Sequence, residues 1–86
     1  MITEVARRIP DGFETHIRSL FGLTLAEARL ATALASGLSL KEATVSSRIT
    51  VKTGRGYLER IFAKTETHQQ SELVALLKST EPLSGR

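Results

Sequence analysis

The sequence has no cysteine, no tryptophan and only two prolines among its 86 residues. The absence of cysteine excludes a disulfide framework and any site built on a thiolate, which is consistent with a reducing compartment. The only aromatic residues are three Phe and one Tyr, so a core must be built mainly from Leu, Ile, Val and Ala. A chain of this length can bury one such core, and we predict a single small domain.

Long apolar runs are missing as well. No run approaches the ~18–20 apolar residues of a membrane span. The first ten residues have no apolar centre of the kind that a signal peptide needs. We therefore expect a cytoplasmic protein, or a domain cut from one, with no membrane partner.

Patterns that support catalysis or metal binding are also absent. His16 and His68 lie far apart, and neither has an Asp or Glu at a metal-ligand spacing. The Ser46-Ser47 pair has no neighbouring His that could act as a base in a known motif. We predict no enzymatic activity, no cofactor and no metal site.

Apolar residues recur at helical spacing, whereas no segment alternates for long enough to predict a strand. Phe13, Ile17 and Leu20, for example, mark one face of a helix. The predicted fold class is all-α, with helices over residues 13–21, 24–36, 39–47, 51–65 and 68–78. A further short helix over residues 1–9 would stop at the turn-forming Pro10-Asp11-Gly12.

Polar residues at the helix starts support these boundaries. Three Ser/Thr-x-x-Glu/Gln patterns predict capping boxes, in which both side chains satisfy backbone N–H groups at the helix start. The three boxes run from Thr24 to Glu27, from Ser39 to Glu42 and from Thr67 to Gln70. Thr50 is a further N-cap candidate, and Gly37 lies where a left-handed C-terminal cap would fall.

The stretch from Ser39 to Lys64 organises the chain, because a short helix, a tight turn and a longer helix form the helix-turn-helix pattern. Residues 41–64 contain six basic and two acidic residues, a net charge of +4, whereas the whole chain carries +3. The basicity is therefore concentrated in this stretch. A basic patch on a helix pair is the electrostatic footprint of nucleic-acid binding.

Five stretches of the chain carry a family resemblance. They are Leu23-Thr24-x-x-Glu27, Ala35-x-Gly37-Leu38-Ser39-x-Lys41-Glu42, Ile49-Thr50-x-Lys52-Thr53, Ile61-x-Ala63-Lys64 and Glu72-Leu73-Val74. Together they resemble the LuxR-type (GerE-like) helix-turn-helix domain of bacterial transcription regulators. The resemblance implies a four-helix domain that binds double-stranded DNA, with its third helix in the major groove. It divides the chain into an N-terminal helix or linker over 1–22, the domain over 23–79 and a mobile tail over 80–86.

The resemblance also implies which residues face DNA. The base-contact candidates are Lys52, Arg55, Gly56 and Glu59, and the phosphate-contact candidates are Lys41, Thr50, Thr53, Tyr57, Arg60 and Lys64. Arg55 suits a bidentate pairing with guanine, and Glu59 fits only where it accepts from a cytosine amino group. The alternatives are that Lys52, Glu59 and Arg60 are solvated surface charges and that Thr50 and Thr53 only cap the helix.

Some positions depart from the family pattern. Gly54 stands where the family has an apolar aliphatic residue, and Glu66 stands where it has glycine. Ala43, Thr44 and Ser47 likewise replace Ile, Ala and Leu. We expect Gly54 to leave a gap beside Ile49, so that Gly54→Val stabilises the domain by filling it.

The last predicted helix is rich in leucine. Its apolar arc exceeds one core-facing stripe, so we expect Leu73, Val74 and Leu77 to form a homodimer interface, unless they simply cap the core.

Two functions remain open. The first is a sequence-specific DNA-binding domain of a transcription regulator. The second is a degenerate helix-turn-helix that binds another protein, such as RNA polymerase, a sigma factor or an N-terminal sensing domain.

Overall fold

A computed structural model describes residues 12–80, which form five helices and no strand. The helices are α1 (Phe13–Phe21), α2 (Leu25–Ala35), α3 (Leu40–Ser46), α4 (Val51–Thr65) and α5 (Gln70–Ser79). The all-α prediction is confirmed, and the helix bounds lie within two residues of the predicted ones. The helix predicted over 1–9 and most of the predicted tail lie outside the described residues.

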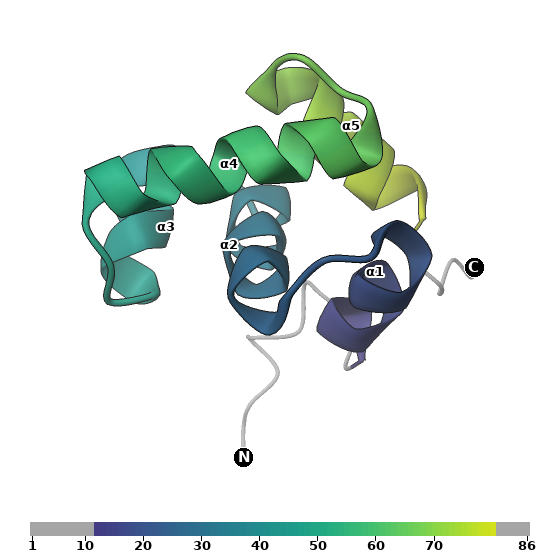
Figure 1. Cartoon of the computed structure of the whole chain (residues 1–86), viewed down its shortest axis with the longest axis horizontal. Coiled ribbons are helices and arrows are strands. Elements are labelled where there is room, and N and C mark those ends of the chain that lie inside the picture. Colours follow the sequence, from purple (N-terminus) through teal and green to yellow (C-terminus); the bar gives the residue numbers. More distant parts are fainter. Residues whose placement is uncertain (1–11, 81–86) are drawn as a thin grey trace.

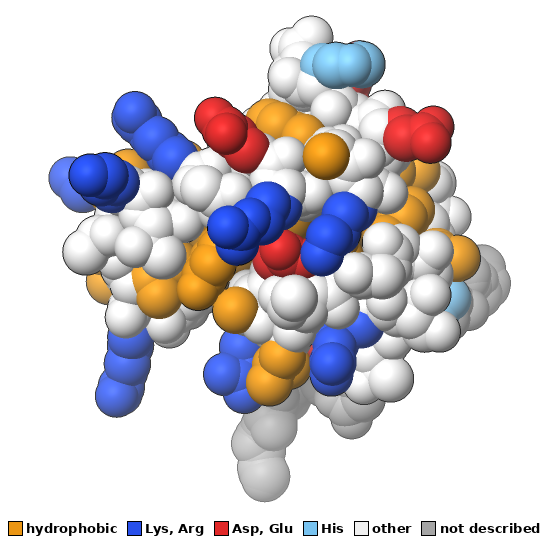
Figure 2. Space-filling model, in the orientation of Figure 1, with side chains coloured by type: hydrophobic (Ala, Val, Ile, Leu, Met, Phe, Trp, Pro, Cys, Tyr) orange, Lys and Arg blue, Asp and Glu red, His pale blue; other side chains and the backbone are white. Residues whose placement is uncertain are grey.

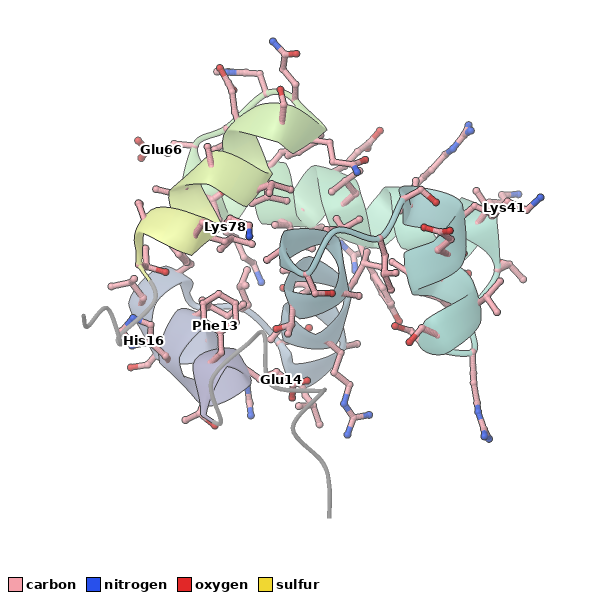
Figure 3. All side chains as sticks on the ribbon, turned by 180° about the vertical axis from the view of Figure 1, so that it is seen from behind. Phe13, Glu14, His16, Lys41, Glu66 and Lys78 are labelled. Atoms are coloured by element: carbon pink, nitrogen blue, oxygen red, sulfur yellow. The ribbon has the colours of Figure 1, made fainter. Side chains whose placement is uncertain are left out.

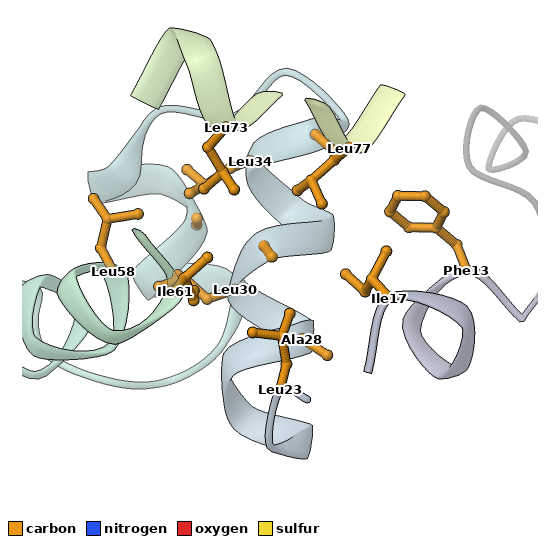
Figure 4. Packing of buried hydrophobic residues seen from close by; sticks show 13 residues of the cluster. Phe13, Ile17, Leu23, Ala28, Leu30, Leu34, Leu58, Ile61, Leu73 and Leu77 are labelled. Carbon is orange, nitrogen blue, oxygen red and sulfur yellow. The ribbon is translucent and has the colours of Figure 1, made fainter. Parts of the chain in front are cut away.

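Helix α2 is the centre of the fold, because it contacts each of the other four helices (Figure 1). Its residues are apolar on most sides, as expected for a helix that is surrounded by others. The core around it is formed by Phe13 and Ile17 of α1, Leu30 and Leu34 of α2, Leu58 and Ile61 of α4, and Leu73 and Leu77 of α5 (Figure 4). Phe13 and Ile17 are 1% and 0% exposed, so α1 belongs to this core and the predicted division after residue 22 cuts through it.

Two of the three predicted capping boxes are confirmed. The Thr24 hydroxyl accepts from the Glu27 N–H at 3.1 Å, and the Glu27 carboxylate accepts from the Thr24 N–H at 3.0 Å. Ser39 and Glu42 make the same reciprocal pair at 3.1 and 2.9 Å. The starts of α2 and α3 are therefore determined by local sequence.

The third predicted box is wrong, because α5 starts two residues later than expected. Its N-cap is Gln69, which has an extended backbone and makes no side-chain cap hydrogen bond. The Thr67 hydroxyl instead lies 2.9 Å from the Thr65 hydroxyl at the end of α4. The carboxylate of Glu72 instead accepts from the N–H of His68, one residue before the N-cap, at 2.7 Å.

Two residues other than glycine adopt left-handed backbone conformations at helix ends. Arg48, with a φ of 61°, lies in the turn between α3 and α4, and the next N–H, that of Ile49, donates to the Thr44 carbonyl at 3.0 Å. Glu66, with a φ of 60°, ends α4. Glycine adopts this conformation at much lower cost, so both positions store strain.

Gly54 lies where α4 packs against α3, and the predicted gap beside it does not exist. A Cβ at residue 54 would overlap the Thr44 Cγ2 methyl and would stand 3.7 Å from Leu40 Cδ1. Thr44 is buried, and its hydroxyl donates to the Lys41 carbonyl at 2.8 Å, which holds the methyl in place. The expectation that Gly54→Val stabilises the domain is therefore wrong, since α3 has already closed on the glycine.

Candidate nucleic-acid interface

Helix α4 has a buried side and an exposed side, as its sequence pattern predicts. Gly54, Leu58, Ile61 and Thr65 are buried against the rest of the fold. The four base-contact candidates, Lys52, Arg55, Gly56 and Glu59, are all exposed. The helical repeat of α4 therefore brings these four residues together on one accessible surface, which we call the α4 face.

Positive charge surrounds the α4 face. Lys41, Lys52, Arg55 and Arg60 are exposed, and none of them has a carboxylate within ion-pair distance among residues 12–80. Figure 2 shows Lys and Arg side chains over the N-terminal end of α4 and along its length. Figure 3 shows Lys41 at the same end of the molecule, on α3. A surface of uncompensated cations attracts a polyanion.

The N-terminus of α4 adds to the positive electrostatic potential of this surface. Each of the other four helices has a glutamate in its first turn, whereas α4 has no acidic residue there. Glutamate in a first turn neutralises the positive end of the helix dipole, so at α4 that end remains uncompensated.

The two threonines at the start of α4 are engaged in capping. The Thr50 hydroxyl accepts from the Thr53 N–H at 3.1 Å and donates to the Thr53 hydroxyl at 3.0 Å. The capping role of Thr50 is thus confirmed. Both side chains are exposed, and the Thr53 hydroxyl proton is still available to a phosphate oxygen.

Lys64 has a partner inside the protein, which changes its predicted role. Its Nζ donates to the Glu27 carboxylate at 2.7 Å, and the Glu27 side chain is only 2% exposed. Burial opposes ionisation of Glu27, but the hydrogen bonds from Lys64 and Thr24 outweigh it and lower the pKa of this carboxyl. We therefore assign Lys64 to the neutralisation of Glu27 in place of the predicted phosphate contact.

Tyr57, the remaining phosphate candidate, is half-buried and packs against the hydrophobic core. An amphipathic Tyr side chain commonly buries its ring and leaves its hydroxyl near solvent. The contact of the Tyr57 hydroxyl with phosphate stays a prediction.

The leucines predicted to form a dimer interface lie inside the monomer. Leu73 and Leu77 are 0% exposed and pack into the core formed with α2. Val74 also packs against this core but stays partly exposed. The predicted interface is therefore wrong for both leucines, because α2 already covers the face that they share.

No family model, curated protein or solved structure matches the chain, so the LuxR-type resemblance rests on the sequence motifs alone. Within the described range, no helix is long and apolar enough to cross a membrane. Residues 12–80 also contain no group of three His, Cys, Asp or Glu side chains that could hold a metal ion.

Sequence reasoning missed the pairing of Glu27 with Lys64. The two residues are 37 positions apart, and Glu27 had a complete local role in its capping box. A signal did exist, because both residues belong to the motif stretches of the resemblance. Their contact, however, requires the packing of α4 across α2, which local spacing does not specify.

Proposed function

We propose that this chain is a sequence-specific DNA-binding domain of a bacterial transcription regulator. The observation that carries the proposal is the α4 face, where Lys52 and Arg55 are exposed and have no carboxylate partner within residues 12–80. The major groove is wide enough to admit one α-helix, and α4 has 15 residues. The motif resemblance supports the same assignment.

Different residues of the surface take different roles in this proposal. Arg55 reads a guanine through two hydrogen bonds, and Glu59 accepts from a cytosine amino group nearby. Lys41, Thr53 and Arg60 contact phosphates on the flanking strands and fix the register of α4 without reading sequence. The uncompensated N-terminus of α4 favours a further phosphate at its N–H groups.

Selection from a pool of random DNA duplexes tests the proposal. Affinity for the selected duplex is then measured across a range of salt concentrations. The two basic phosphate contacts, Lys41 and Arg60, predict that log K falls with log salt with a slope of roughly −2, because each phosphate that a cation neutralises releases a counterion. Selection of no sequence, together with no measurable binding at low salt, would contradict the proposal.

Lys78→Ala is the matched control for this titration. Lys78 is exposed on α5, and Figure 3 shows it on the opposite side of the molecule from Lys41. Loss of its charge should leave the salt slope unchanged. Lys41→Ala, by contrast, should reduce the magnitude of the slope by about 1, the contribution of one phosphate contact. Equal effects of the two substitutions would indicate a diffuse charge effect without a defined interface.

A protein-binding role is the second candidate, and one observation favours it. Leu20 of α1 and Leu25 of α2 are 51% and 42% exposed although both are large and apolar. Exposed apolar side chains are common on partner-binding surfaces, but single ones also occur widely on monomers. Substitution of both leucines by Ser should leave DNA affinity unchanged if the two surfaces are independent.

A further inference from the structure

Helix α4 contains two glycines whose surroundings differ completely. Gly54 is buried, and a Cβ there would overlap the methyl of Thr44. Gly56 is exposed, and a Cβ there would meet nothing within 4 Å. Internal packing therefore requires a glycine at residue 54 and places no such requirement on residue 56.

The fold gains nothing else from Gly56. The residue lies in the interior of α4, and its φ is outside the positive range that favours glycine. Glycine is the least favourable residue in a helix interior after proline, so alanine would strengthen α4 at this point. The missing side chain therefore weakens the helix, and neither packing nor backbone conformation within residues 12–80 requires it.

The neighbours of Gly56 indicate what approaches it from outside. Lys52 and Arg60 are one turn away on either side, and Arg55 and Glu59 lie on the same exposed side of the helix. The three basic residues have no carboxylate partner within residues 12–80. Gly56 thus lies at the centre of a cationic surface, and it is the only exposed residue of α4 that has no side chain.

We propose that Gly56 is the point at which the α4 backbone comes closest to the base edges of bound DNA. This inference rests on the proposed function and makes Gly56 a specificity-determining residue. A side chain at residue 56 would hold the helix away from the groove floor, which Arg55 and Glu59 must reach to make direct hydrogen bonds with bases. Contacts to phosphates at the groove edges tolerate such a displacement better, because a longer and solvated ionic contact retains much of its attraction.

The test compares Gly56→Ala and Gly56→Leu with the original chain on the selected duplex and on an unrelated duplex. Gly56→Ala should raise Tm by about 4–8 °C, because it removes a helix-interior glycine. The same substitution should weaken binding to the selected duplex by about tenfold or more, the scale of one lost base contact. Gly56→Leu should weaken it further. Affinity for the unrelated duplex and the salt slope should change little, since the substitution alters no charge.

Ala75→Leu is the control, because Ala75 is exposed on α5 and the change adds bulk to a helix surface outside α4. It should leave affinity for both duplexes unchanged. If the original chain binds a selected duplex and Gly56→Ala binds it equally well, the inference about Gly56 fails while the proposed function stands. If the original chain binds no duplex at all, the proposed function fails and the inference fails with it.

Discussion

At the scale of single residues, the contact between Thr44 and Gly54 determines how closely α3 and α4 pack. We predict that Gly54→Ala destabilises the domain, because the new methyl must displace the buried Thr44 methyl. Overpacking of this kind costs about 1–3 kcal/mol, which exceeds the gain of ~1 kcal/mol in helix propensity. Denaturant unfolding measures the change.

A double-mutant cycle tests the cause of that effect. Thr44→Ser removes the Cγ2 methyl and keeps the hydroxyl that donates to the Lys41 carbonyl. In the Thr44→Ser background, Gly54→Ala should become neutral or stabilising, because the nearest remaining contact is an ordinary one at 3.7 Å. An unchanged cost of Gly54→Ala in this background would show that the overlap with Thr44 is not the reason.

Glu66 affects stability through its backbone conformation. Its φ of 60° is left-handed, so Glu66→Gly should stabilise the domain by about 1 kcal/mol. Glu14 provides a control of opposite sign, because it lies in the first turn of α1, where glycine should destabilise. A lower melting midpoint for Glu66→Gly would mean that the glutamate side chain contributes more than its backbone costs.

At the scale of helices, the ion pair between Glu27 and Lys64 joins the start of α2 to the end of α4. Because the pKa of Glu27 is lower in the folded state, the pair stabilises the fold at pH values above the ordinary glutamate value of about 4.5. This contribution should disappear as the pH falls through the lowered pKa of the folded state. Glu27→Gln should therefore show a weaker loss of stability between neutral and acidic pH.

Lys64→Met complements this pH measurement. It leaves the Glu27 carboxylate buried without a cation and should cost about 1–3 kcal/mol at neutral pH. The cost is smaller than for a fully buried pair, because the Lys64 side chain is 34% exposed. A Lys64→Met protein that unfolds at the same denaturant concentration as the original chain would contradict a structural role for the pair.

The predictable part of the helices is the part that depends on local sequence. The boxes at Thr24 and Ser39 satisfy N–H groups within three residues, so their patterns sufficed to predict the starts of α2 and α3. The pattern at Thr67 failed because Thr67 pairs with the buried Thr65 hydroxyl of the preceding helix. The close packing of α3 against α4 at Gly54 could not be predicted from local sequence either, since it depends on tertiary packing.

At the scale of the whole molecule, the fold buries the leucines of α5 in its core and leaves the α4 face exposed. The leucines of α5 that suggested a dimer complete the core around α2, so they provide no surface for a second chain. The α4 face remains exposed and carries cations that lack carboxylate partners within residues 12–80. Helical periodicity predicted this face from sequence, whereas the loss of Lys64 to Glu27 required the structure.

The central claim is that the α4 face recognises a DNA sequence, and Arg55→Ala tests it most directly. The measurement is the affinity of Arg55→Ala and of the original chain for the selected duplex and for variants with each base pair changed in turn. We expect a loss of about 1–3 kcal/mol on the selected duplex and a relaxed preference at one G·C pair. An equal loss of affinity on every duplex, with all base preferences intact, would contradict base recognition by Arg55 and leave it a phosphate contact.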